Sequence, residues 1–267
     1  MLFRSWFCHD RSWYFHNLFR RHPECLQLIV GAIRHNLANM ASELGSAREF
    51  ISPSDLTFSW DGCHRCLWIY YNHSLRVPAF MPLVSDLAAM QEKYFAGKSS
   101  ADLAPVIPAG KVESLGGWVK SANIEVNGSK TKFAIRGKYD LLMKFEDGTY
   151  GIIDCKFQAK DSDKTDLYGP QLEAYAFALE NPESGAPKTV SLMGLLVWSL
   201  IEPAGDVNKG FGLKLKHTWR PITRNPQALQ QRLTDFITVV SGNMPSSKTS
   251  CEQCRYLNQR KDFIGAE

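Results

Sequence analysis

The sequence predicts an α/β fold, in which strands alternate along the chain with helices. Segments that favour strands, separated by turn signals, alternate with segments whose apolar residues have helical spacing. A chain of 267 residues with 44% hydrophobic and 22% charged residues can also bury a full core. The longest apolar runs, such as 192–201, are much shorter than the roughly 20 residues of a transmembrane helix, so no membrane association is expected.

Residues 1–39 differ from the rest of the chain in charge. They contain five arginines against one aspartate and one glutamate, which gives three of the four net positive charges. Two interpretations stay open: an extension with a helix at 26–37, or a non-native or disordered segment that precedes a start at Met40. We favour the second, and we expect the folded domain to comprise residues 40–267.

The first elements after Met40 are expected to be helical. The segment SPSDL at 52–56 has the residues of a helix start and predicts a short helix that leads to Trp60. Apolar residues with helical spacing predict a second helix at 83–95. Prolines and glycines then indicate a loop at 105–117.

Strands follow, arranged around two turns. Segments 118–126 and 131–145 suit strands, and Asn127-Gly128 between them is a typical hairpin turn because both residues accept positive φ. A second turn at Asp147-Gly148 leads to a third strand at 149–157. The remaining elements are a helix at 167–179, strands at 190–200 and 210–220, and a helix at 226–240.

Three charged residues beside the turn at Asp147 predict a metal site. Asp154 and Lys156 are two apart in one strand, so they share a face of the sheet. With the turn centred near Asp147, Asp140 falls opposite Asp154, and the two carboxylates suit Mg²⁺ or Mn²⁺, with the Cys155 carbonyl as a further candidate ligand. Such a cation and a nearby ammonium meet the demands of phosphodiester hydrolysis, so Lys156 is expected to orient or help deprotonate the attacking water.

The same charges also have a structural interpretation, because alternating acidic and basic residues are common on a solvated sheet face. The metal site is favoured by the apolar run at 151–153 directly before Asp154, where an unpaired charge is costly to bury. The helix expected at 167–179 adds the polar side chains of Gln171 and Tyr175.

Five positions in this region resemble the PD-(D/E)XK nuclease superfamily. GKYD, which ends at Asp140, is similar to the family's strand with its first metal-binding aspartate, and IIDCK is similar to its (D/E)xK strand, with Asp154 and Lys156. Gln171 and Tyr175 resemble the QxxxY helix motif of the RecB-like branch, which includes CRISPR adaptation nucleases and AddB-type nuclease domains. The resemblance implies that these five residues are catalytic, and it implies a restriction-endonuclease-like core with a mixed central β-sheet flanked by helices.

The family also has a further metal ligand, a glutamate or histidine on an upstream helix. The helix expected at 83–95 offers Glu92, and Glu113 is a second candidate. No motif surrounds Glu92, and an exposed glutamate on a helix is commonly only solvated. If Glu92 is that further ligand, the metal ligands that the resemblance implies are Asp140, Asp154 and Glu92.

Four of the seven cysteines form two CxxC pairs, one near each end of residues 40–267. An odd number of cysteines without a secretion signal argues against a disulfide framework and for a reducing cytoplasm. Two such pairs in polar surroundings favour a metal centre over unrelated thiols, and four thiolates suit Zn²⁺ or a [4Fe-4S] cluster equally by ligand count. Part of the RecB-like branch binds an iron-sulfur cluster through one cysteine and a later group of three, so the resemblance implies [4Fe-4S], with Zn²⁺ as the alternative. The two pairs are Cys63/Cys66 and Cys251/Cys254.

Two functions from different classes stay open. The first is a Mg²⁺-dependent DNA nuclease, an exonuclease or endonuclease that acts on single strands or free ends in repair, recombination or foreign-DNA processing. The second is a catalytically weak or inactive nucleic-acid-binding module that a cysteine-bound metal holds together. The complete set of Asp140, Asp154 and Lys156 favours the nuclease, because a decayed site is expected to lose at least one charge. The net charge of +4 permits a polyanionic partner without identifying it, and no protein partner is indicated.

Overall fold

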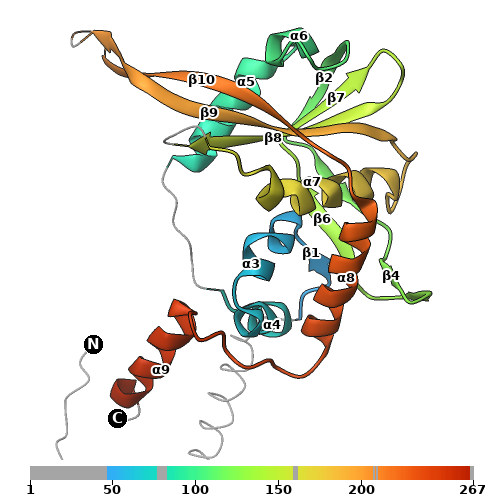
Figure 1. The fold of residues 1–267 in the computed structure, drawn as a ribbon, viewed down its shortest axis with the longest axis vertical. Helices are drawn as coiled ribbons and strands as arrows, with labels where there is room; N and C mark the ends of the chain where they lie inside the picture. Colours follow the sequence, from blue (N-terminus) through green and yellow to red (C-terminus); the bar gives the residue numbers. More distant parts are fainter. Residues whose placement is uncertain (1–46, 77–82, 159–161, 207, 209, 265–267) are drawn as a thin grey trace, which may run out of the picture. The chain divides into compact units, whose positions relative to one another are not determined.

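The computed structural model describes residues 47–76, 83–158, 162–206, 208 and 210–264 (Figure 1). These residues belong to one compact unit, Ala47–Glu267. The expectations for residues 1–39 and for a start at Met40 fall outside the described residues. The fold is α/β, with a mixed sheet flanked by helices, as the sequence predicts. In the described part of the chain, every helix is too short or too polar to cross a bilayer.

The central sheet has five strands in the order β10-β9-β8-β7-β2. β8 and β9 are parallel and the other neighbours are antiparallel, which makes the sheet mixed. Parallel neighbours need a crossover, and helix α7 (Thr165–Glu180) provides it between β8 and β9. The strands are β2 (Gly110–Leu115), β7 (Leu141–Phe145), β8 (Tyr150–Gln158), β9 (Val190–Asp206) and β10 (Gly210–Ile222).

A smaller sheet has the order β1-β6-β3, and β4 and β5 form a separate hairpin. In that hairpin Val126 pairs with Ser129, and Asn127 and Gly128 have φ angles of 50° and 76°. The predicted hairpin turn is therefore confirmed. The strands are β1 (Phe50–Ile51), β3 (Trp118–Lys120), β4 (Glu125–Val126), β5 (Ser129–Lys130) and β6 (Ala134–Lys138).

Helices cover both faces of the central sheet. Because side chains alternate along β8, Ile152 packs with Leu172 of α7 on one face, and Ile153 packs with Phe95 of α5 on the other. A third core joins α4 and α8, where Tyr71 stacks edge-on against Phe236 at 5.1 Å. The helices are η1 (Pro53–Leu56), α3 (Phe58–Asp61), α4 (His64–His73), α5 (Val84–Phe95), α6 (Ser100–Leu103), α8 (Pro226–Ser241) and α9 (Glu252–Ile264).

Three sequence expectations were wrong. Segment 131–145 is not one strand: it breaks at Tyr139-Asp140, and its halves, β6 and β7, lie in different sheets. Likewise only the two ends of 118–126 form strands. The loop expected at 105–117 contains β2, whose partly polar sequence gave no strand signal because β2 is an edge strand on which Lys111 and Glu113 are exposed.

Candidate functional site

Asp140 lies where the chain passes from β6 of the smaller sheet to β7 of the central sheet, and Asp154 lies within β8. Leu141 pairs with Ile153 across β7 and β8, and this register places Asp140, the residue before β7, opposite Asp154. The N–H of Cys155 donates to Asp140 Oδ2 at 2.7 Å, which holds the Asp140 carboxylate against β8. The predicted register is confirmed, and the catalytic roles of the two aspartates stay predictions.

The Asp154 carboxylate is the centre of the site. It is 3% exposed, its Oδ1 accepts a hydrogen bond from Gln171 Nε2 at 3.1 Å, and its Oδ2 lies 2.7 Å from Lys156 Nζ. Lys156 Nζ also lies 4.5 Å from the centroid of the Tyr168 ring, a cation–π contact that the sequence analysis missed. The available signal was the spacing of Tyr168, which is three residues before Gln171 and so on the same face of α7.

The hydroxyl of Tyr175 bonds to the backbone, and burial and the charges of both aspartates raise its pKa. Its hydroxyl donates to the carbonyl oxygen of Lys138 at 2.8 Å and so ties α7 to β6. A Cβ atom at Gly137 would lie 2.7 Å from Pro53 Cδ and 3.0 Å from Tyr175 Cε1. The absence of a side chain at Gly137 therefore lets Tyr175 approach the strand that leads to Asp140.

Glu92 on α5 lies near this site, and Glu113 does not. Glu92 Oε1 is 3.1 Å from Lys138 Nζ, and its negative charge contributes to raising the pKa of Asp140. Glu113 instead pairs with Lys188 at 3.0 Å. Among the described residues, the four cysteines are the one group of three or more potential ligands whose ligand atoms all lie within 4.8 Å of one another. Glu92 and the two aspartates therefore do not converge that closely.

Burial and mutual repulsion make the aspartates hard to ionise together. Burial, followed by the charge of Asp154, raises the pKa of Asp140 to about 7. Burial also raises the pKa of Asp154, although Lys156 opposes this. Burial lowers the pKa of Lys156, but the charge of Asp154 outweighs burial and raises it, so Lys156 carries a positive charge. A buried carboxylate and a half-buried one, with one neutralising cation, fit a divalent metal ion, which prefers oxygen ligands and relieves their repulsion.

The stability of the metal-free protein is expected to fall with rising pH because of Asp140. Its pKa is raised from the ordinary 3.8 to about 7, so the folded state binds more protons than the unfolded state between these values. The stability contributed by this proton is fully present below the ordinary pKa and is lost as pH rises through about 7. Urea unfolding gives the free energy of unfolding of metal-free wild type and of Asp140→Asn at about pH 5 and about pH 8. The difference between the two proteins in how this free energy changes with pH measures the contribution of Asp140.

Asparagine does not titrate, so the Asp140→Asn variant should lose less stability than wild type over this interval. The exposed Asp235 on α8 supplies the matched control, and Asp235→Asn should follow wild type. If the stability of wild type and of Asp140→Asn depends equally on pH, the raised pKa of Asp140 is contradicted.

The two CxxC pairs come together although 185 residues separate Cys66 from Cys251. The Sγ atom of Cys66 lies 3.5 Å from that of Cys254 and 3.7 Å from that of Cys251, and the sulfurs of Cys63 and Cys254 are 3.9 Å apart. All four sulfurs lie within 4.8 Å of one another, so these residues can bind a metal ion, as the sequence predicts. Burial raises the pKa of Cys63, but N–H groups including that of Lys248 outweigh burial and lower it to about 6.

A model of the PD-(D/E)XK nuclease superfamily matches residues 83–259, which is well over half of the chain. The chain belongs to the PD-(D/E)XK nuclease superfamily. The match covers Glu92, both aspartates, Lys156 and the second CxxC pair, and it begins after the first pair. Membership indicates a metal-dependent nuclease that acts on a nucleic acid, as is usual for this superfamily.

Two further comparisons add little to the PD-(D/E)XK assignment. No curated protein matches the chain. A solved structure described as "Crystal structure of SSO0001" is 14% identical, covers 82% of this chain and 88% of that chain, and has a TM-score of 0.40. At this level of similarity it does not bear on the function of the chain.

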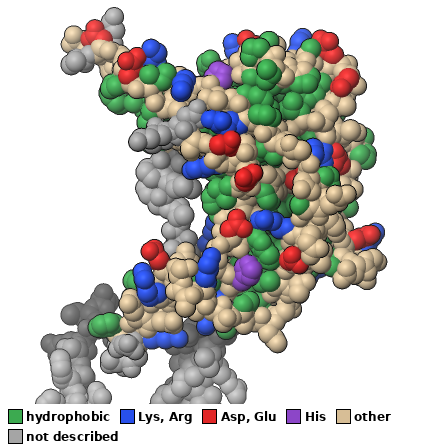
Figure 2. Space-filling view, in the orientation of Figure 1, with side chains coloured by type: hydrophobic (Ala, Val, Ile, Leu, Met, Phe, Trp, Pro, Cys, Tyr) green, Lys and Arg blue, Asp and Glu red, His purple; other side chains and the backbone are tan. Residues whose placement is uncertain are grey.

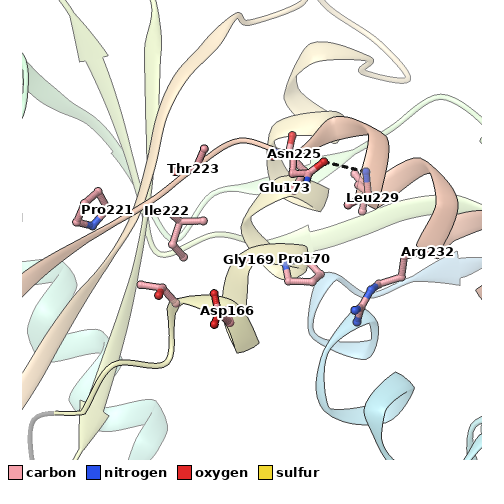
Figure 3. Close-up of a pocket in the computed structure, with 12 residues that line it drawn as sticks. Asp166, Gly169, Pro170, Glu173, Pro221, Ile222, Thr223, Asn225, Leu229 and Arg232 are labelled. Atoms are coloured by element: carbon pink, nitrogen blue, oxygen red, sulfur yellow. Dashed lines mark hydrogen bonds between the residues drawn. The ribbon is translucent and has the colours of Figure 1, made fainter.

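A pocket of about 390 Å³ between α7, the end of β10 and α8 is not the PD-(D/E)XK site (Figure 3). Its α7 lining includes Asp166, Gly169 and Glu173. By helical periodicity these positions lie on the opposite face of α7 from Gln171 and Tyr175. The pocket is therefore separated from the aspartates by the helix itself.

On the face that Figure 2 shows, acidic and basic side chains are interspersed, so this face has no continuous basic surface for binding nucleic acid. This fits the small excess of 31 basic over 27 acidic residues in the whole chain. The nuclease interpretation therefore rests on the site residues and not on a basic surface.

Proposed function

We propose that this PD-(D/E)XK protein is a Mg²⁺- or Mn²⁺-dependent deoxyribonuclease of the RecB-like branch. The observation that carries the proposal is the buried Asp154 carboxylate, which contacts both Lys156 and Gln171 and lies opposite Asp140. Asp140, Asp154 and Glu92 are proposed to hold the metal. When bound, that ion promotes deprotonation of the attacking water and offsets negative charge at phosphorus.

Lys156 is proposed to stabilise charge on the phosphate. Its raised pKa keeps the side chain protonated, so it suits a cation that orients water or phosphate better than it suits a general base. Asp154 and the ring of Tyr168 hold the ammonium from two directions. A fixed cation costs little reorganisation when negative charge develops in the transition state.

Gln171 and Tyr175 are proposed to position this machinery. Gln171 orients the Asp154 carboxylate by donating to Oδ1, and Tyr175 fixes the backbone at Lys138, two residues before Asp140. Their match to the QxxxY motif supports the RecB-like branch. This supports a substrate of single-stranded DNA or DNA with free ends, in repair, recombination or foreign-DNA processing.

The cysteine centre is proposed to join segments from both ends of the domain. Its metal is either the [4Fe-4S] cluster that the RecB-like resemblance implies or a zinc ion, and the spacing of the sulfurs bears on this choice. The proposed compartment is the cytoplasm, because seven cysteines, an odd number, suit a reducing environment.

Cleavage assays with the full chain test the proposed function. Labelled single-stranded, double-stranded and circular DNA, with matching RNA, are incubated with Mg²⁺, with Mn²⁺ and with a chelator. We expect metal-dependent cleavage of DNA. Cleavage of linear but not of circular DNA would identify an exonuclease, because an exonuclease needs a free end. Absence of cleavage from every substrate, together with measurable binding, would support the alternative of a catalytically inactive nucleic-acid-binding module.

Lys156→Met is expected to lower cleavage by about 10²-fold, because it removes one preorganised charge from the transition state. Mn²⁺ binding should persist, since both aspartates remain. Lys214→Met is the matched control, because Lys214 pairs with Glu202 at 2.8 Å on the exposed β9–β10 hairpin. Cleavage by Lys156→Met at the wild-type rate would overturn the role of Lys156.

A further inference from the structure

The spacing of the four cysteine sulfurs distinguishes between two kinds of metal centre. A zinc ion bound by four thiolates at about 2.3 Å in a tetrahedron places the sulfurs about 3.8 Å apart. Three of the four separations between the CxxC pairs are 3.5, 3.7 and 3.9 Å, and no two of the four sulfurs are more than 4.8 Å apart. These distances fit four ligands that share one ion.

An iron-sulfur cluster requires a wider arrangement. In a [4Fe-4S] cluster each thiolate binds a different iron atom, so the cluster separates the sulfurs. The sulfur of Cys66 lies within 3.7 Å of both sulfurs of the other pair, those of Cys251 and Cys254, which leaves room for one ion but not for a cluster of eight atoms. The geometry therefore disagrees with the centre that the family resemblance implies.

We propose that Cys63, Cys66, Cys251 and Cys254 bind a single zinc ion, and that this ion fixes helix α9 to helix α4. The proposal does not depend on nuclease activity. It concerns residues both outside and inside the superfamily match, because the first CxxC pair precedes residue 83 and the second lies within 83–259.

The backbone presents both pairs in the same way. Cys63 directly precedes α4 and Cys66 lies in its first turn, while Cys251 directly precedes α9 and Cys254 lies in its first turn. Thiolates at helix starts are stabilised by free N–H groups and the helix dipole. The Lys248 N–H, 3.5 Å from Cys63 Sγ, adds a further donor.

The surrounding sequence suits the charge of the centre. One zinc ion with four thiolates carries two net negative charges. Against the acidic Asp61 and Glu252, the sequence around the cysteines has three basic residues, which can offset part of this charge. These residues are Arg65, Lys248 and Arg255.

The described side chains of helix α9 bury little surface apart from Cys254. Among the side chains of α9 that the structure describes, Cys254 alone is buried, and the others are exposed, including Tyr256, Leu257 and Phe263. A helix without a buried apolar face gains little stability from packing. The bond between metal and Cys254 therefore supplies a docking interaction that the other described side chains of α9 do not.

Metal analysis of the full chain tests the identity of the ion. The protein is purified without oxygen from cells supplied with both iron and zinc, so that loss of a cluster to air cannot mimic a zinc site. We expect about one zinc ion per chain, no stoichiometric iron or labile sulfide, and no visible absorption. Replacement by Co²⁺ should give the absorption bands of a tetrahedral cobalt–thiolate site. Stoichiometric iron with visible absorption, or no metal at all, would overturn the proposal.

Variants test the ligands. Cys66→Ser and Cys254→Ser should each lose the zinc ion, whereas Cys155→Ser should retain it, because Cys155 is buried in β8 outside the cluster. Full zinc content in both cluster variants would contradict the assignment. The Co²⁺ spectrum of wild type remains decisive if a variant does not fold.

Limited proteolysis tests the docking of α9. Removal of zinc from wild type by a chelator should raise the rate of cleavage at 242–250, between α8 and α9, by about tenfold or more, since segments without packing open readily. Restored zinc should reverse the effect. An unchanged cleavage rate after verified zinc loss would show that other contacts hold α9.

Discussion

Replacing Asp154 with asparagine is expected to lower the rate of DNA cleavage by about 10³-fold, the largest effect that we predict on activity. Asparagine has nearly the same shape, but it removes the negative charge that binds the metal and pairs with Lys156. A bound cation contributes several kcal/mol to the transition state, and each 1.4 kcal/mol or so is a factor of ten in rate. Single-turnover cleavage in saturating Mg²⁺ measures the loss.

The fold should survive Asp154→Asn. Asp154 is 3% exposed and burial raises its pKa, so a neutral amide removes a buried charge that is costly to the folded state. Lys156 keeps its contact with the Tyr168 ring and its attraction to Asp140, so thermal unfolding should show no large loss of stability. Asp235→Asn controls for the chemistry of the change, because Asp235 is an exposed aspartate on α8 whose side chain contacts Gln231. A variant that cleaves within tenfold of wild type would exclude Asp154 as a central metal ligand.

The largest predicted effect on stability belongs to Arg224→Met, at about 3 kcal/mol of lost unfolding free energy. Arg224 Nε donates to Glu173 Oε1 at 2.8 Å, and its two terminal nitrogens donate to the oxygens of Glu180, each at 2.9 Å. Glu173 is 3% exposed, so the variant leaves a buried carboxylate whose remaining partner is the N–H of Asn225 at 2.8 Å. Urea unfolding at neutral pH measures the change.

Two comparisons isolate the buried pair. Lys214→Met removes an ion pair whose side chains are 58% and 56% exposed, and it should change stability by less than about 1 kcal/mol. Adding Glu173→Gln to Arg224→Met should restore part of the stability, because the second change removes the uncompensated charge. If Arg224→Met lowers the free energy of unfolding no more than Lys214→Met does, the contacts of Arg224 with Glu173 and Glu180 do not stabilise the junction of β10, α7 and α8.

Short-range patterns determined much of the candidate site. The turn at Asp147-Gly148 sets the register of β7 against β8, so the sequence placed Asp140 opposite Asp154 without knowledge of any other strand. Helical spacing likewise predicted α7 and the order of Gln171 and Tyr175 along it. Such patterns involve residues that are close in the sequence, within about one helical turn or one hairpin, so the sequence alone is enough to recognise them.

Contacts between distant segments decided the rest. Nothing local to 131–145 indicates that the chain changes sheets at Tyr139-Asp140, because the break follows from the pairing of β6 with β1 and of β7 with β8. The same holds for the approach of Glu92 to Lys138, since these residues are 46 positions apart. Side-chain contacts across such separations depend on packing that no local pattern encodes.

The sequence by itself determined the chemistry that is available: two aspartates and a lysine in register on one hairpin, and two CxxC pairs with metal-ligand spacing. Only the tertiary structure decided that the Asp154 carboxylate is buried between Lys156 and Gln171, and that four sulfurs meet at separations that fit a single ion. The physical reason is that motif spacing fixes which groups can act together, whereas burial and distance, which set pKa and choice of metal, arise when remote segments pack.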